Sequence, residues 1–81
     1  MKLFIGNLSW NATEADLRKS FGRFGVISDL KIILDKDSGK SRGFGFVSYE
    51  TKEAGETAIH EMDGTDFLGR ALRVSPAVER R

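Results

Sequence analysis

Hydrophobic and polar residues alternate most regularly over Arg42–Tyr49, which reads Arg-Gly-Phe-Gly-Phe-Val-Ser-Tyr. A period of two residues is typical of a β-strand, in which successive side chains point to opposite faces. Phe44 and Phe46 would share one face of this strand, and Val47 and Tyr49 would share the other. The two glycines inside the strand indicate a close approach of the backbone to a neighbour. Periodicity does not show which face is buried, so the rest of the chain has to decide whether the phenylalanines are core or surface residues.

Three further stretches predict strands, because their apolar residues also recur at every second position. These stretches are Lys2–Leu8, Ile27–Leu34 and Ala71–Pro76. Pro76 has no amide hydrogen to donate to a neighbouring strand, so it marks the end of the last strand or an edge. The polar segment Asp35–Ser41 contains Asp-Ser-Gly and predicts a loop or hairpin connection before the central strand.

Two segments with apolar residues at helical spacing lie between the strands. The first helix is predicted over Glu14–Gly22, with Thr13 as its N-cap and Asp16 as an acidic variant of the capping box. Gly25 suits a left-handed residue just past the end of this helix. The second helix, capped by the threonine at its start, is predicted over Thr51–Met62.

The predicted order of elements is strand, helix, strand, strand, helix, strand. Four strands and two helices favour an α+β domain in which the helices cover only one face of the sheet. The core then needs the apolar residues that face the helices: Leu3, Ile5, Leu17, Phe21, Phe24, Leu30, Ile32, Val47, Tyr49, Ala58, Ile59, Met62, Leu72 and Val74.

Phe4, Phe44 and Phe46 are not needed for this core, because they fall on the opposite face of their strands. The other residues expected on that face are polar or charged: Lys2, Asp29, Lys31, Arg73 and Ser75. An exposed aromatic cluster with cations at its rim usually marks a binding surface. We therefore expect the three phenylalanines to form a binding surface rather than part of the core.

The chain of 81 residues is expected to be one domain, residues 1–78, followed by a poorly ordered tail at 79–81. Its net charge is only +1, so a basic surface depends on where the cations lie and not on their number. There is no cysteine, which excludes disulfides and thiolate zinc sites. No apolar run has the length of a membrane helix or signal peptide. We expect an intracellular protein without membrane contact, cytoplasmic in a bacterium and nuclear or cytoplasmic in a eukaryote.

Two segments carry a resemblance to the RNA-recognition motif family. Arg42–Tyr49 matches the octapeptide signature of that family at every constrained position. Leu3–Leu8, Leu-Phe-Ile-Gly-Asn-Leu, is similar to the hexapeptide signature on the first strand of the family. The chain looks most like the small single-domain members of bacteria and of plant glycine-rich proteins, although it has no glycine-rich tail. The resemblance implies a ferredoxin-like βαββαβ fold, with the two signature strands at the centre of a four-stranded antiparallel sheet and both helices behind it.

The resemblance also implies that single-stranded RNA lies on the open face of the sheet. By position, Phe4 and either Phe44 or Phe46 match the base-stacking aromatics of the family, and Arg42 matches its phosphate-contacting residue. Further donors, acceptors and cations complete the expected RNA-binding site: Lys2, Asn7, Lys31, Lys40, Arg73 and Ser75. We expect a monomer without cofactor or metal, with single-stranded DNA as an alternative ligand.

Two other functional classes stay open beside RNA binding. A protein-interaction module could use the same fold, with a partner on the acidic face of the second helix, at Glu53, Glu56 and Glu61. A small ferredoxin-like enzyme such as an acylphosphatase would need a phosphate-cradling loop with a catalytic arginine, and the sequence contains no such loop. His60 is expected to be solvated rather than catalytic. We expect Trp10 to pack against the edge of the core, with contact to a nucleotide as the alternative.

Overall fold

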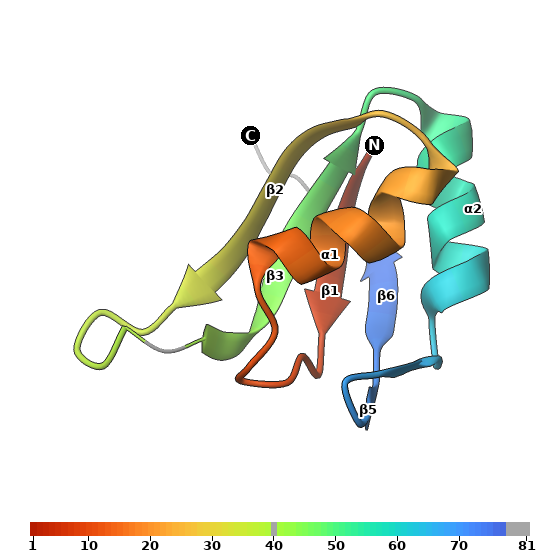
Figure 1. Ribbon diagram of the computed structural model, residues 1–81. Coiled ribbons are helices and arrows are strands. Elements are labelled where there is room, and N and C mark those ends of the chain that lie inside the picture. Colours follow the sequence, from red (N-terminus) through yellow and green to blue (C-terminus); the bar gives the residue numbers. More distant parts are fainter. Residues whose placement is uncertain (40, 78–81) are drawn as a thin grey trace.

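A four-stranded antiparallel sheet and two helices on one of its faces make up the structure, a computed structural model that describes residues 1–39 and 41–77 (Figure 1). For Ser41 and Arg42 only the backbone is described. The strands lie in the spatial order β2 (Ile27–Leu34), β3 (Ser41–Tyr49), β1 (Lys2–Gly6) and β6 (Arg73–Pro76). The helices are α1 (Glu14–Phe21) and α2 (Lys52–Met62). The predicted α+β, ferredoxin-like βαββαβ fold is confirmed, with both signature strands at the centre.

The predicted capping box at the start of α1 is present. The hydroxyl of Thr13 accepts a hydrogen bond from the Asp16 amide at 3.1 Å, and the Asp16 carboxylate accepts one from the Thr13 amide at 3.1 Å. These two bonds satisfy backbone donors that have no partner within the helix, which is why the helix begins here.

The end of α1 differs from the prediction. The helix ends at Phe21 and tightens into the 3-10 turn η1 (Gly22–Phe24). Gly25 is extended, not left-handed as predicted. A Cβ atom at Gly25 would lie 2.5 Å from the Cβ of Ala54 on α2, so glycine is required by the close packing of α2 and not by the conformation of the helix end.

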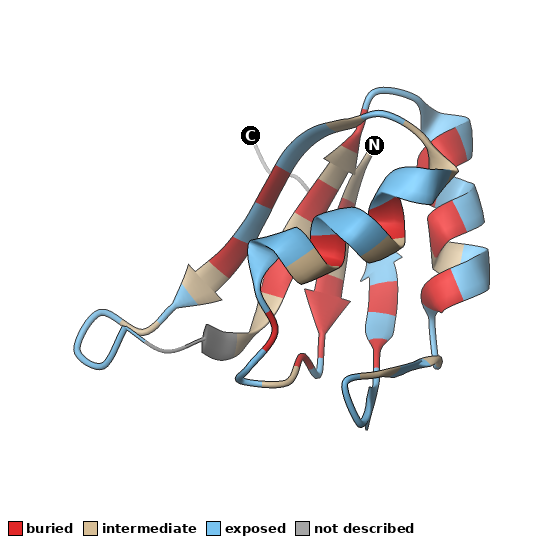
Figure 2. Ribbon diagram, in the orientation of Figure 1, coloured by how far each residue is buried: buried red, intermediate tan, exposed pale blue. Residues whose placement is uncertain are grey.

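The core lies between the helices and the sheet (Figure 2). The predicted core side chains are buried, except Phe24 and Ile59, which are half-buried at its margin. Leu8, Ala12 and Ala54 are also buried, although the predicted set did not include them. The hydroxyl of Tyr49 donates a buried hydrogen bond of 2.6 Å to the backbone oxygen of Phe21 and so ties β3 to α1.

The predicted last strand, Ala71–Pro76, is divided in the structure. β4 (Asp66–Phe67) and β5 (Arg70–Ala71) form a separate hairpin, and β6 begins at Arg73. The division occurs because the main chain of Leu72 bonds to the residues that follow α2, with its amide 2.9 Å from the Thr65 oxygen. The side-chain pattern gave no sign of this break, because Leu72 is buried whether or not the strand is continuous.

An outward-pointing amide on each outer strand is bonded to a carboxylate. The Ile32 amide on β2 donates to Oε2 of Glu14 at 3.3 Å, and the Val74 amide on β6 donates to Oδ1 of Asp63 at 2.9 Å. These bonds fasten the start of α1 to β2 and the end of α2 to β6.

A membrane-spanning helix is not found within residues 1–39 and 41–77, because each helix there is too short or too polar.

Candidate functional site

The face of the sheet opposite the helices carries three rows of directly paired residues. Across the sheet, the rows are Asp29–Ser48–Lys2, Lys31–Phe46–Phe4–Ser75 and Phe44–Gly6–Arg73. Side chains of paired residues in an antiparallel sheet lie on the same face. Most of the predicted site residues are therefore neighbours on one surface.

Phe4, Phe44 and Phe46 form a contiguous group at the centre of these rows, here called the aromatic cluster. The ring centroid of Phe4 lies 5.8 Å from that of Phe44 and 5.9 Å from that of Phe46, and Phe44 and Phe46 are 6.2 Å apart. All three side chains are half-buried, unlike the residues of the core. The rings are tilted or edge-to-face, which is a favourable arrangement for neighbouring aromatics.

Two glycines of the central strands allow close packing, one beneath the aromatic cluster and one on the opposite face of the sheet. A Cβ atom at Gly6 would lie 2.8 Å from Cε1 of Phe4, so the ring of Phe4 occupies the space above Gly6. On the opposite face of β3, a Cβ atom at Gly45 would collide with the main chain of Lys31 and Ile32. Gly45 is therefore the close backbone approach that the sequence indicated.

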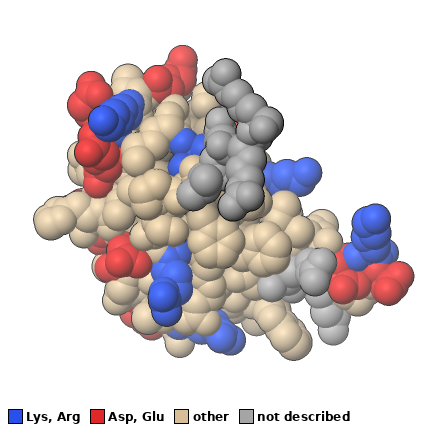
Figure 3. All heavy atoms as spheres, turned by 180° about the vertical axis from the view of Figure 1, so that it is seen from behind, with Lys and Arg blue, Asp and Glu red and all other residues tan. Residues whose placement is uncertain are grey.

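Cations lie on both sides of the aromatic cluster. The ammonium of Lys2 is 4.7 Å from the ring centroid of Phe46, which is within the range of a cation–π contact. Lys31 is paired with Phe46 on the β2 side, and Arg73 occupies the row of Phe44 on the β6 side. Figure 3 shows this face, with a largely uncharged centre and with both lysine or arginine and aspartate or glutamate side chains around it. The arrangement can hold flat apolar rings at its centre and anions at its margin.

Asn7 lies at the end of β1, and its described hydrogen bonds are to other parts of the protein. Its Oδ1 accepts from Nη2 of Arg70 at 2.8 Å and from Nε at 3.2 Å, and its Nδ2 donates to the Ala71 oxygen at 2.7 Å. Arg70 was not among the predicted site residues, because it lies 63 positions from Asn7 in the chain. Of the other expected residues, Lys40 and the side chain of Arg42 lie outside what the structure describes, as does the tail at 79–81.

Trp10 does not pack against the core, so that prediction is wrong. Its side chain is 69% exposed, and the much smaller Ala12 takes the buried position in this connection. Trp10 and the exposed Leu34 line a shallow hollow on the helix side of β2, together with Glu14. The hollow does not include any member of the aromatic cluster.

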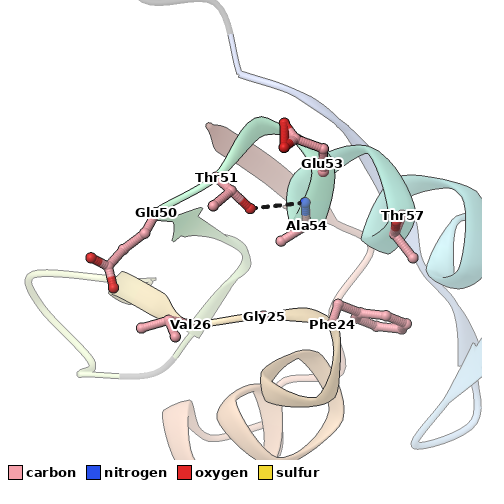
Figure 4. A pocket seen from close by; sticks show the side chains of 8 residues that line it. All are labelled: Phe24, Gly25, Val26, Glu50, Thr51, Glu53, Ala54 and Thr57. Atoms are coloured by element: carbon pink, nitrogen blue, oxygen red, sulfur yellow. Dashed lines mark hydrogen bonds between the residues drawn. The ribbon is translucent and has the colours of Figure 1, made fainter.

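A second hollow on the helix side lies between the start of β2 and the start of α2 (Figure 4). Phe24 and Val26 line one side, and Glu53 lines the other beside Ala54, whose amide bonds to the Thr51 hydroxyl. The Arg23 guanidinium lies 4.5 Å from the ring centroid of Phe24. The hollow therefore has charges of both signs around it. These charges select neither an acidic nor a basic binding partner.

His60 is exposed on α2, as expected. In the described part of the chain, no three His, Cys, Asp or Glu side chains are grouped so that they could hold a metal ion. Burial raises the pKa of Tyr49 to about 12, against a smaller opposing effect of Arg23, but this side chain belongs to the core.

Comparison with known proteins gives consistent matches. A family model described as RNA recognition motif matches residues 3–73. The mitochondrial glycine-rich RNA-binding protein 2 of Arabidopsis thaliana is 51% identical over 79 residues, which cover 98% of this chain and 50% of the relative. This chain therefore spans about half the length of that curated relative.

Solved structures match over nearly the whole chain. The crystal structure of RNA-binding protein PG1 superimposes with a TM-score of 0.94 at 37% identity, covering 100% of this chain and 98% of the other. A structure titled as a complex of the SXL-lethal protein with RNA superimposes with a TM-score of 0.93 at 26% identity, covering 99% of this chain and 48% of the other.

Proposed function

This chain belongs to the RNA recognition motif family, and on that premise we propose that it binds single-stranded RNA on the open face of its sheet. The observation that carries the proposal is the aromatic cluster, three adjoining rings on the face that the helices do not cover. Bases of an unpaired strand are free to stack on aromatic rings, whereas bases inside a duplex are not. The similarity to proteins named for RNA binding supports the same ligand.

In this proposal, bases stack on Phe4, Phe44 and Phe46, and the surrounding cations contact phosphates. Lys2 lies over the ring of Phe46. A base that stacks on Phe46 therefore has to displace the Lys2 ammonium, which can move toward the phosphates of the RNA. The rings of Phe4 and Phe44 are the first stacking positions for this reason. The remaining members of the proposed site supply hydrogen bonds and charge at the rim: Asn7, Lys31, Lys40, Arg42, Arg73 and Ser75.

The proposed role is binding and not catalysis, by a chain that acts as a monomer inside the cell. The named Arabidopsis relative is mitochondrial, which supports an intracellular setting. Single-stranded DNA offers the same bases and phosphates and is the alternative ligand, distinguished by the absence of the 2′-hydroxyl. A protein partner on the acidic face of α2 is the second function, but the mixed charges around the hollow beside it give that function less support.

The proposal is tested by titrating a fluorescently labelled, unstructured RNA of eight nucleotides with the protein, beside the same sequence in a duplex. We expect the single strand to bind and the duplex to bind much more weakly, since stacking requires unpaired bases. Equal binding of the two forms would show that charge alone holds the RNA, and the proposed use of the aromatic cluster would then be wrong.

The affinity for RNA should depend only weakly on salt. Among the side chains that the structure describes, few cations adjoin the aromatic cluster, and Asp29 lies in the row of Lys2, so we expect two or three neutralised phosphates. For a single strand this number gives a slope of about −1.4 to −2 in log affinity against log salt concentration. Titrations between low and moderate salt measure the slope. A much steeper slope would require a basic surface beyond these rows.

A further inference from the structure

The guanidinium of Arg70 is held in a fixed orientation by Asn7. Two of its nitrogens, Nε and Nη2, donate to the same oxygen of Asn7, at 3.2 and 2.8 Å. The amide nitrogen of Asn7 is in turn bonded to the Ala71 oxygen at 2.7 Å, so the asparagine cannot turn away without losing all three bonds. Ordering an exposed arginine side chain costs rotamer entropy, which these hydrogen bonds offset.

The bonds to Asn7 use only one edge of the guanidinium. Arginine has five N–H donors in a planar fork, and the edge formed by Nε and Nη2 accounts for the two donors that Asn7 accepts. The edge formed by Nη1 and the second hydrogen of Nη2 takes no part in these bonds, and two adjacent N–H groups of a guanidinium can bind a phosphate through parallel hydrogen bonds. Within residues 1–39 and 41–77, the side chain of Arg70 is exposed and forms no ion pair with a carboxylate.

The Arg70 guanidinium is held next to the row of residues that contains Phe44. Asn7 follows Gly6, which is paired with Phe44 on one side and Arg73 on the other. The amide of the next residue, Leu8, bonds to the oxygen of Gly43 at 2.9 Å, beside Phe44. Arg70 is thus held one residue beyond the row Phe44–Gly6–Arg73, at the end of the sheet where the β4–β5 hairpin projects (Figure 1).

Two residues other than glycine adopt positive φ angles in the segments that bring Arg70 to Asn7. Asn7 has a φ of +57° and Leu68 at the hairpin tip has a φ of +53°, in the left-handed region that side chains other than glycine and asparagine avoid. With Gly69 at +87°, Leu68 forms a tight two-residue turn that fixes where Arg70 leaves the hairpin. Asparagine tolerates this conformation, so the strained residue is Leu68, which is retained because the turn places Arg70 beside Asn7.

The geometry points to a phosphate-binding position at Arg70, which receives a backbone phosphate of the nucleic acid next to the base on Phe44, with Asn7 as the residue that positions it. This inference rests on the proposed function and adds a residue to that site. It also changes the expected role of Asn7, which acts through Arg70 and not by contacting the RNA itself.

The test compares Arg70→Ala, Asn7→Gly and the double variant in titrations of the eight-nucleotide RNA at several salt concentrations. Glycine is chosen at position 7 because it adopts a positive φ freely and so removes the amide without straining the backbone. Arg70→Ala should weaken binding about tenfold and reduce the salt slope by about 0.7, the contribution of one phosphate. Asn7→Gly should weaken binding by a smaller factor, and it should add nothing further to Arg70→Ala.

Arg18→Ala is the matched control, since it removes an exposed arginine from α1, on the far side of the protein. It should leave both the affinity and the salt slope unchanged. An unchanged slope in Arg70→Ala would overturn the phosphate position, and an equal loss from Asn7→Gly with and without Arg70 would overturn the positioning role. Both results presuppose that the unaltered protein binds the RNA. If it does not bind, the proposed function fails first and this inference fails with it.

Discussion

Replacing Phe44 with alanine should weaken the binding of a short single-stranded RNA by about 1–3 kcal/mol, which is roughly 5- to 150-fold in affinity. The ring is half-buried at the centre of the sheet and touches Phe4 and Phe46. Its loss removes a stacking position and loosens its two neighbours, so a second alanine at Phe46 need not add its full effect. The free energy of unfolding should fall by only about 1 kcal/mol, which is the typical contribution of such aromatic contacts. If Phe44 were a core residue, the loss of stability would instead be about 3–5 kcal/mol.

Phe24→Ala is the matched control for this experiment. Phe24 is also half-buried and also has an edge-to-face contact, with the ring centroid of Phe21 at 6.4 Å, but it lies on the helix side. Urea melts should show at least as large a loss of stability in Phe24→Ala, because Phe24 packs against the core, whereas RNA titrations should show a loss of affinity only in Phe44→Ala. A similar loss of affinity in Phe24→Ala would mean that weakened folding, and not a missing ring, explains the result.

Tyr49→Ala should lower the free energy of unfolding by about 3–5 kcal/mol, a large share of the stability of a small domain. Tyr49 is on the same strand as Phe44 but on the other face, where it is only 2% exposed. The variant removes a buried ring and its 2.6 Å hydrogen bond to the Phe21 oxygen. RNA titrations well below the melting temperature should show unchanged affinity for the folded fraction. A variant that melts like the unaltered protein but does not bind RNA would reverse the assignment of the two faces.

Tyr49→Phe separates the hydroxyl from the ring and tests the environment of Tyr49 by pH. Burial raises the pKa of the hydroxyl from its ordinary value of 10 to about 12, so the folded state keeps a proton that the unfolded state releases. Its contribution to stability is therefore complete below pH 10 and is lost as the pH rises through 12. The expected slope in that interval is about 1.4 kcal/mol per pH unit. Denaturant melts of Tyr49→Phe should lack this component of the pH dependence.

Alternation along the strands was sufficient to predict the α+β class and the aromatic face, whereas the antiparallel strand order was implied only by the resemblance to the RNA-recognition motif family. Leu3 and Ile5 are buried on one side of β1 while Phe4 lies on the other, as a period of two requires. The same rule separated Val47 and Tyr49 from the phenylalanines of β3. These predictions succeeded because strand periodicity and a single covered face leave little freedom in a domain of this size.

The contacts of Asn7 could not be predicted in the same way. Its partner Arg70 belongs to the β4–β5 hairpin, in a segment whose sequence predicted only an irregular connection. The hydrogen bond also joins residues that are 63 positions apart in the chain. Leu68 gave no turn signal, because leucine is not a residue that favours positive φ. Trp10 was misplaced because periodicity carries no information in an irregular connection, where a small residue can take the buried position.

The carboxylates of Glu14 and Asp63 also protect the two outer strands of the sheet from pairing with another strand. A strand at the edge of a sheet usually offers free amides to which another strand can add. Here a strand approaching Ile32 or Val74 meets a carboxylate in place of a free amide, and at Pro76 there is no amide hydrogen at all. We therefore expect edge-to-edge pairing between the sheets of neighbouring molecules to be disfavoured at these points. If the protein binds a long RNA as we propose, we expect each molecule to occupy its own few nucleotides and to bind and dissociate independently of its neighbours.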